Sequence, residues 1–216
     1  MISLGVRSVH VNARLPPGQV LTKGYPILHA GTVPYSLTRE NWTLKLSGAV
    51  ELPQTLSFPD LLAMPQKSVT TDIHCVTSWT KLDTVWAGVP FRAIADRARP
   101  RPSARFVIME CEQGFTTSLP IEPLLEDTVL VAHTYDNAPL PPEHGGPVRM
   151  FVPKRYFYKS AKWLRGLRFV ENDEPGFWEV RGYSNVADPW METRYDVDDV
   201  RVIHRMRKAN LFQPPQ

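Results

Sequence analysis

Polar and hydrophobic residues alternate with a period of two in several short stretches of the chain. In residues 42–50, Trp42, Leu44 and Leu46 alternate with polar side chains, which is typical of a strand with one buried face. Further strand patterns cover residues 69–76, 105–111, 128–133, 148–152 and 167–170. The chain is therefore predicted to consist mainly of short strands.

Two other stretches have the spacing of short amphipathic helices. Ser57 is a suitable N-cap for a helix that has Pro59 in its first turn and ends at Pro65. A second helix follows Pro90, has apolar residues on one face, and stops before Pro100. Strands and helices do not alternate regularly, as they would in a doubly wound sheet. We therefore expect an α+β fold with a mixed β-sheet and short helices.

The beginning of the chain lacks such periodicity. Residues 1–38 are rich in proline, glycine and threonine, which favours an irregular N-terminal arm packed on the domain. The chain has 216 residues, a length that suits one domain, here residues 39–216. Its 21 prolines are about twice the usual share and predict short elements joined by rigid loops.

Composition excludes several classes of protein. A formal net charge of +3 is too small to indicate nucleic-acid binding. No run of about 18 apolar residues predicts a membrane span, and no secretory signal is visible, so we expect a cytoplasmic protein. The two cysteines, Cys75 and Cys111, cannot form a disulfide scaffold and lack the CxxC spacing of structural zinc sites.

Charge is segregated late in the chain. Residues 149–170 contain seven basic residues and no acidic one, whereas residues 171–199 contain nine acidic residues and only two arginines. A charged run is often a solvated surface. In this basic block, however, Tyr156, Phe157, Tyr158 and Trp163 lie between the charges, which favours partial burial around an anion such as a phosphate-bearing cofactor.

Cys75 is the main candidate for chemistry, because no GxGxxG after a strand, P-loop, HExxH or GxSxG motif occurs. It lies at the end of a predicted strand. From the residues alone it is a buried small hydrophobe, a nucleophile, or a zinc ligand together with Cys111 and two histidines. His74 is adjacent on the strand and faces the other way, so the base would be His29, His133 or His144.

Four ordered motifs carry a family resemblance. They are DIHCVTSW at 72–79, WAGVPF at 86–91, HGGPVR at 144–149, and VPKRY at 152–156 leading to KSAKW at 159–163. In this order and spacing they resemble the molybdopterin-binding domain of the sulfite oxidase family, over about residues 25–190. The chain also resembles the catalytic subunit of bacterial protein-methionine-sulfoxide reductase within that family. The resemblance implies a sulfite oxidase-like molybdopterin-binding fold.

The resemblance also implies a cofactor and its site. One pyranopterin would hold molybdenum through two sulfurs, and Cys75 matches the family cysteine that is the third sulfur ligand. Other positions match residues on the cofactor: Arg149 with Ser160, Ala161 and Lys162 at its phosphate, His144 and Cys111 near the pterin, and His29 in the arm above it. For Cys111, a small buried strand residue remains an alternative to a second metal ligand.

Departures from the family pattern bear on the substrate. Sulfite oxidases have Ala-Gly-Asn-Arg-Arg after the cysteine, whereas residues 76–80 are uncharged here, so sulfite is not the expected substrate. The methionine sulfoxide reductase subunit has Cys-Val-Glu-Ala-Trp, and Thr77 replaces its glutamate. The chain ends soon after the match, so neither haem nor the family's dimerisation domain is expected, and we expect a monomer.

The expected function is a molybdenum cofactor-dependent oxidoreductase that transfers an oxygen atom with two electrons. Its small-molecule substrate would be an S-oxide, an N-oxide or an oxyanion. Because no haem, flavin or iron-sulfur motif is visible, electrons would be exchanged with a separate partner. A non-catalytic protein that binds molybdopterin or an anion is the alternative, and a cysteine hydrolase is a third hypothesis.

Overall fold

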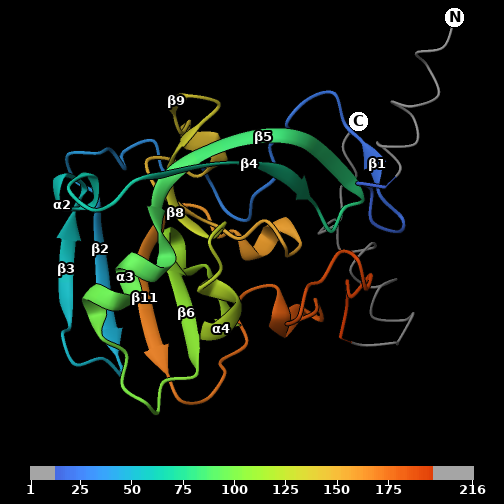
Figure 1. Cartoon of the computed structure of the whole chain (residues 1–216). Helices are drawn as coiled ribbons and strands as arrows, with labels where there is room; N and C mark the ends of the chain where they lie inside the picture. Colours follow the sequence, from blue (N-terminus) through green and yellow to red (C-terminus); the bar gives the residue numbers. More distant parts are fainter. Residues whose placement is uncertain (1–12, 197–216) are drawn as a thin grey trace, which may run out of the picture.

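The computed structural model describes residues 13–196, which form two β-sheets with short helices between the strands (Figure 1). Residues 1–12 of the predicted arm and 197–216 of the predicted domain lie outside the described residues. The α+β class predicted from the sequence is confirmed, although there are two mixed sheets where one was expected. None of the described helices is long and apolar enough to cross a membrane.

The larger sheet contains six of the described strands. They are β1 (Val20–Leu21), β4 (Lys67–His74), β5 (Trp79–Pro90), β8 (Leu130–Tyr135), β9 (Ala138–Pro139) and β10 (Arg149–Phe151). The order is β1-β5-β8-β10, with β4 also paired to β5 and β9 to β8. Only β1 runs parallel to its neighbour among these pairs. The long β4–β5 hairpin arches over the molecule in Figure 1.

The second sheet contains five described strands in the order β3-β2-β11-β6-β7. They are β2 (Thr43–Gly48), β3 (Gln54–Ser57), β6 (Phe106–Cys111), β7 (Thr116–Pro120) and β11 (Leu164–Val170). β2 and β11 are parallel, and the other pairs are antiparallel. The described helices are α2 (Phe58–Leu62), α3 (Phe91–Ala98), α4 (Ile121–Leu124) and the 3-10 turns η1 (Glu112–Gly114), η2 (Pro142–His144), η3 (Phe157–Lys159) and η4 (Glu179–Arg181).

Both predicted helices form where the sequence places them. Ser57 caps α2 in a capping box, because its hydroxyl accepts from the Asp60 amide and the Asp60 carboxylate accepts from the Ser57 amide. α3 buries Phe91 and Ile94 and ends where Arg99 adopts a left-handed conformation with φ of 53°. Local capping and apolar spacing were therefore sufficient to predict these two elements.

The sequence pattern does not predict β5, the longest described strand. Asp83 has a left-handed φ of 56° within it, and the pairing of β5 with β4 and β8 shifts register between Thr71 and Ile73 and between Ala87 and Gly88. Such bulges interrupt the alternation of period two on which strand prediction depends. The short strands β3 and β7 are mostly polar and are missed as well.

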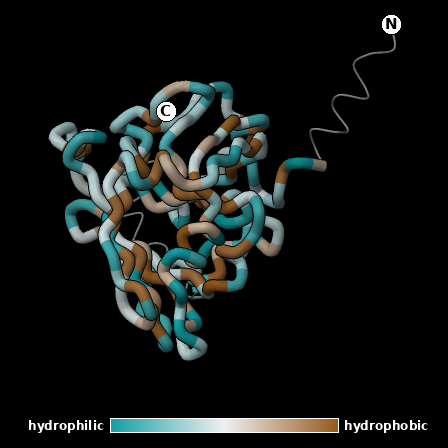
Figure 2. Tube along the Cα trace, turned by 60° about the vertical axis from the view of Figure 1, so that its left-hand side comes forward, coloured by the Kyte–Doolittle hydropathy of each residue, from teal (hydrophilic) through white to brown (hydrophobic). Residues whose placement is uncertain are grey.

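Two hydrophobic clusters fill the interior. One packs the five-stranded sheet against α2 and α3 and includes Trp42 and Met150, whereas the other lies under the β4–β5 hairpin and includes Trp86 and Phe151. Figure 2 shows how short hydrophobic and hydrophilic stretches follow one another along the trace. Consecutive β10 residues thus face different clusters. The Met150 amide also donates to the Ala161 carbonyl at 2.9 Å, so β10 and the connection that leads to β11 lie between the two clusters.

Gly88 allows the backbones of β5 and β8 to approach closely. A Cβ added there would lie 2.2 Å from the Val131 carbonyl oxygen and 2.6 Å from the Ala132 Cα. We expect Gly88→Ala to lower the free energy of unfolding by about 2 kcal/mol, measured by urea denaturation. Gly24→Ala is the control, because no atom lies within 4 Å of its added Cβ. Equal stability of the two variants would contradict the packing argument.

Candidate functional site

A cavity of about 400 Å³ is lined by residues from several distant segments of the described chain. This volume is within the usual range for small-molecule sites, about 300–1,000 Å³. Its walls come from residues 25–30 of the N-terminal segment, the β4–β5 turn, the β6–β7 connection, β10 with the β10–β11 connection, and the segment after β11. Six of the residues predicted from the family resemblance line it: His29, Cys75, Arg149, Ser160, Ala161 and Lys162.

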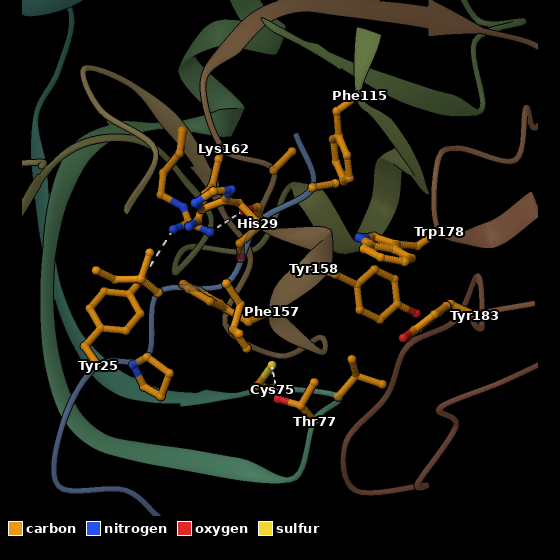
Figure 3. Close-up of a pocket in the computed structure, with 18 of the residues that line it drawn as sticks. Tyr25, His29, Cys75, Thr77, Phe115, Phe157, Tyr158, Lys162, Trp178 and Tyr183 are labelled. Atoms are coloured by element: carbon orange, nitrogen blue, oxygen red, sulfur yellow. Dashed lines mark hydrogen bonds between the residues drawn. The ribbon is translucent and has the colours of Figure 1, made fainter. Parts of the chain in front are cut away.

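Cys75 is held at the cavity by the tight turn of the β4–β5 hairpin. The Cys75 amide donates to the Trp79 carbonyl at 2.9 Å, and the Ser78 amide donates to the Cys75 carbonyl at 3.0 Å. Ser78 closes the turn with a left-handed φ of 74°. The Thr77 hydroxyl lies 3.1 Å from the Cys75 sulfur and donates to it (Figure 3). The strand end therefore presents the sulfur to the cavity with one donor beside it.

The surroundings of Cys75 do not suit a hydrolytic nucleophile. Burial raises the pKa of its thiol. The Thr77 hydrogen bond and the charges of Arg194 and Lys162 lower this pKa by a smaller amount, so the net shift is upward. Among the described residues no histidine hydrogen-bonds to the sulfur. His133 instead contacts Gln66 at 2.9 Å. The cysteine hydrolase hypothesis therefore finds no support in the geometry.

The zinc hypothesis also lacks a geometric basis. Cys75 belongs to the hydrophobic cluster under the hairpin, whereas Cys111 belongs to the other cluster and does not line the cavity. Within residues 13–196 no group of three or more histidine, cysteine or acidic side chains could hold a metal ion. Both cysteines are free thiols in the buried interior. The structure thus favours the alternative of Cys111 as a small buried strand residue.

Arg149 is a cation in the interior of the protein. Its side chain extends from β10 and is only 1% exposed. The guanidinium donates to the His144 carbonyl at 2.6 Å, to the Tyr25 hydroxyl at 3.2 Å and to the Ser160 carbonyl. It forms no ion pair with any described carboxylate, and burial lowers its pKa. The Met150 carbonyl accepts from Nε at 3.3 Å, so four neutral oxygen atoms hold a positive charge at the cavity wall.

Lys162 adds a second cation close to the first. Its ammonium donates to the Glu143 carbonyl at 2.6 Å and has no ion-pair partner in the part of the chain that the structure describes. Burial, together with the charge of Arg149, lowers its pKa to about 7. Two partly uncompensated cations beside one cavity favour an anionic ligand, such as a phosphate group.

The lowered pKa of Lys162 predicts pH-dependent anion binding in protein made without cofactor. A bound anion stabilises the charged form of Lys162. Above about pH 7 the lysine is mostly neutral and must take up a proton when the anion binds, so binding weakens as pH rises. Sulfate keeps its charge in this range, and we expect its affinity to fall by up to about tenfold per pH unit above that pKa, measured by calorimetry. Lys162→Met should abolish the pH dependence. A pH-independent wild-type affinity would contradict this assignment.

His144 lies behind the cavity wall, and its ring is not part of the lining. The ring stacks on Tyr25 with a centroid distance of 3.7 Å and an interplanar angle of 5°. Burial and the charges of Lys162 and Arg149 lower its pKa to about 4, so the ring is neutral at pH 7. Its buried Nδ1 has no hydrogen-bond partner within the described part of the chain. Tyr25 lines the cavity, so His144 would influence a ligand bound there through its contact with the Tyr25 ring.

Aromatic residues form one side of the cavity, and among them only Tyr158 was named in the sequence analysis, as one of the rings between the basic residues. Phe115, Tyr158, Trp178 and Tyr183 all line it, and we refer to them as the aromatic wall. In Figure 3 they lie opposite Lys162, His29 and Tyr25, with Cys75 and Thr77 between the two groups. Trp178 and Tyr183 come from the acidic stretch 171–199. These two aromatic residues were a signal in the sequence that part of the acidic stretch is buried, because large aromatic residues are unusual in a purely solvated acidic segment.

The seven residues of the basic block separate into two that line the cavity and five that pair with carboxylates elsewhere. Only Arg149 and Lys162 line the cavity. The others pair with carboxylates elsewhere: Lys154 with Glu126, Arg155 with Asp188, Lys159 with Glu179, Arg165 with Glu112, and Arg168 with Glu110 and Glu174. Proximity in sequence does not determine direction, because the block runs from β10 through turns and the 3-10 turn η3 into β11, and each of these elements points its side chains differently.

Comparisons with known proteins agree with the family resemblance. The family model described as oxidoreductase molybdopterin binding domain matches residues 30–178. An uncharacterized oxidoreductase of Bacillus subtilis, YuiH, is 45% identical over 187 residues, which cover 87% of this chain and 94% of that protein. The protein-methionine-sulfoxide reductase catalytic subunit MsrP of Ralstonia nicotianae is 28% identical, covering 76% of this chain and 55% of that subunit.

A solved structure shares the fold. The sulfane dehydrogenase SoxCD from Paracoccus pantotrophus superposes with a TM-score of 0.59 at 24% identity, covering 63% of this chain and 40% of that chain. This chain thus spans only about half the length of the sulfoxide reductase relative, but nearly all of the Bacillus protein. Because the family model covers most of the chain and one relative is 45% identical, the protein belongs to the family of oxidoreductases with a molybdopterin binding domain.

Proposed function

We propose that this enzyme reduces small sulfoxides in a molybdopterin-dependent reaction. Each turnover would convert one sulfoxide, two electrons and two protons into one thioether and one water. A separate reductant, a one- or two-electron carrier, would supply the electrons. The sulfoxide reductase relatives support this direction, and so does the absence of charge in residues 76–80 after Cys75.

The cavity fits the cofactor in three respects. The Cys75 sulfur faces it and is a soft ligand suited to a high-valent metal. The unpaired cations Arg149 and Lys162 complement the terminal phosphate of the pterin, beside the Ser160 and Ala161 backbone. The buried indole nitrogen of Trp79 has no hydrogen-bond partner among residues 13–196, although Trp79 lines the cavity. The pairing of a cavity-facing thiol with two uncompensated cations is the observation that carries the proposal.

The bound cofactor supplies a metal that can exchange an oxygen atom and two electrons with the substrate. The protein's own residues hold and shield it. Cys75 must lose its thiol proton to act as a ligand, and the Thr77 hydroxyl then donates to the thiolate and orients its lone pairs. His29 lines the cavity from the N-terminal segment. His144 and Cys111 support the surrounding wall from outside the cavity.

Metal and pterin content together with turnover test this proposal. The protein is produced in a host that makes the cofactor, metals are measured by plasma mass spectrometry, and the oxidised pterin is measured by fluorescence. We expect equimolar molybdenum and pterin, and oxidation of reduced methyl viologen when methyl phenyl sulfoxide is added. Nitrate serves as an anionic comparison and should be a poor substrate.

The possible outcomes separate the rival functions. Zinc or no metal, with no pterin, would overturn the proposal. Loading with molybdenum and pterin, without reduction of any sulfoxide, N-oxide or oxyanion, would favour a non-catalytic binding protein. The cytoplasmic location, the monomeric state and the lack of haem stay predictions from the sequence.

A further inference from the structure

The aromatic wall forms a connected set of rings on one side of the cavity. Tyr183 lies at its centre, 5.5 Å from Tyr158 and 5.0 Å from Trp178 between ring centroids. Phe115 extends the wall through Phe177, whose ring is 5.5 Å from Phe115 and 5.0 Å from Trp178. The charged lining residues, Arg149 and Lys162, lie elsewhere on the cavity surface. The wall is thus an aromatic face of the cavity that is separate from its charged side chains.

A buried ion pair lies directly behind this wall. Lys159 and Glu179 are 2.5 Å apart, and their side chains are 0% and 2% exposed. Lys159 follows Tyr158 in the chain, and Glu179 follows Trp178, so the pair ties the two wall segments together. Lys159 also donates to the Ser118 carbonyl on β7 at 2.9 Å.

Further hydrogen bonds hold the same two segments. The Asn185 side chain accepts from the Lys159 ammonium at 2.8 Å, and the Thr117 hydroxyl donates to Glu179. The Tyr158 hydroxyl donates to the Ser184 carbonyl, so its polar atom is occupied and its ring faces the cavity. The burial of the charges makes the arrangement rigid, because separating them would leave an uncompensated charge in the interior.

We propose that the aromatic wall binds the apolar substituent of the substrate, and that the Lys159–Glu179 pair positions the wall. The inference rests on the proposed reduction of sulfoxides and names the part of the substrate that the enzyme recognises. Aromatic rings pack favourably against methyl and aryl substituents, and no charged side chain of the wall would bind an oxyanion. The preferred substrate is therefore a neutral sulfoxide with an alkyl or aryl group.

Substitutions of Trp178 test the wall directly. With reduced methyl viologen as donor, we expect Trp178→Leu to raise the KM for methyl phenyl sulfoxide about tenfold and to change kcat less than about twofold. The KM for dimethyl sulfoxide, which has no aryl group, should change less. Trp178→Phe keeps an aromatic face and should restore most of the affinity. An unchanged KM in fully loaded Trp178→Leu would overturn the inference.

A binding measurement keeps failure of the wall distinct from failure of the proposed reaction. Methyl phenyl sulfone is a non-reducible analogue whose binding can be followed by saturation-transfer NMR. Sulfone binding that is lost in Trp178→Leu would support the wall, even if the wild type reduced no sulfoxide. If the wild type reduces the sulfoxide but Trp178→Leu binds the sulfone as well as the wild type does, the role of the wall would be refuted and the proposed reaction would stand.

Paired substitutions of Glu179 test positioning. Glu179→Gln can still accept hydrogen bonds from Lys159 and Thr117, whereas Glu179→Ala cannot. We expect Glu179→Ala to raise the KM for methyl phenyl sulfoxide about fivefold, with Glu179→Gln within about twofold of wild type. Both should keep wild-type molybdenum and pterin content. A folded, loaded Glu179→Ala variant with wild-type KM would refute the positioning role.

A milder variant and a matched control complete the test. If Glu179→Ala does not fold, Asn185→Ala removes one acceptor of Lys159 and should raise the same KM by a smaller factor. An unchanged KM in Asn185→Ala would then count against the positioning role. Arg168→Met breaks ion pairs with Glu110 and Glu174 away from the cavity and should leave both KM values unchanged.

Discussion

Cys75→Ser is expected to lower turnover by more than about a hundredfold, because second-shell changes alone often cost about 10- to 100-fold and this variant replaces a metal ligand. A serine oxygen is a harder and weaker donor than a thiolate. The variant should also change the visible absorption of the loaded enzyme. The pterin should remain bound, because the proposed phosphate contacts of Arg149 and Lys162 are intact.

Cys111→Ser is the matched control for this substitution. Both thiols are buried, but Cys111 does not line the cavity. We expect the Cys111 variant to keep its absorption spectrum and most of its turnover. Equal losses in the two variants, or full activity of Cys75→Ser, would contradict the ligand role of Cys75.

Arg149→Met is expected to have the second large effect, on both stability and cofactor retention. The guanidinium satisfies the Tyr25 hydroxyl and the His144 and Ser160 carbonyls, and each buried group left without a partner costs about 1–3 kcal/mol. We therefore expect a loss of about 3 kcal/mol in the free energy of unfolding, measured by urea denaturation. Pterin content, measured by fluorescence, should fall about tenfold or more.

Two further variants show whether charge or hydrogen-bond geometry matters at this position. Arg149→Lys retains the charge but lacks the fork of donors, so it should recover only part of the pterin content. Lys154→Met removes a charge from the same basic block at an exposed position paired with Glu126, and should change neither quantity. Wild-type pterin content in a folded Arg149→Met variant would refute the assignment of Arg149 to the cofactor.

The candidate site divides into a part predicted from the sequence and a part that was not. Six of eight predicted residues line one cavity, because they lie in short motifs whose local turns and strand ends set their direction. Cys75 is an example, since its turn is closed by bonds within residues 75–79. His144 and Cys111 do not line the cavity. Their motifs place them near the site without determining which way each side chain points.

The aromatic wall could not be derived in the same way. Phe115 comes from the β6–β7 connection, Tyr158 from η3, and Trp178 and Tyr183 from the segment after β11. No short motif contains these residues together. Their convergence depends on the packing of β7, η3 and η4 around Lys159, which is a contact between distant parts of the chain. Periodicity and capping signals report only on neighbours in sequence.

The sequence by itself determined the family, the α+β class, both predicted helices and the position of Cys75 at a strand end, because these depend on local spacing and ordered motifs. Only the tertiary structure decided which basic residues face the cavity and which are neutralised elsewhere. Lys159 and Lys162 are three positions apart, yet one is paired with Glu179 in the interior and the other lines the site without a described carboxylate partner. That difference arises because the charge state and partners of a buried side chain are set by the segments packed around it.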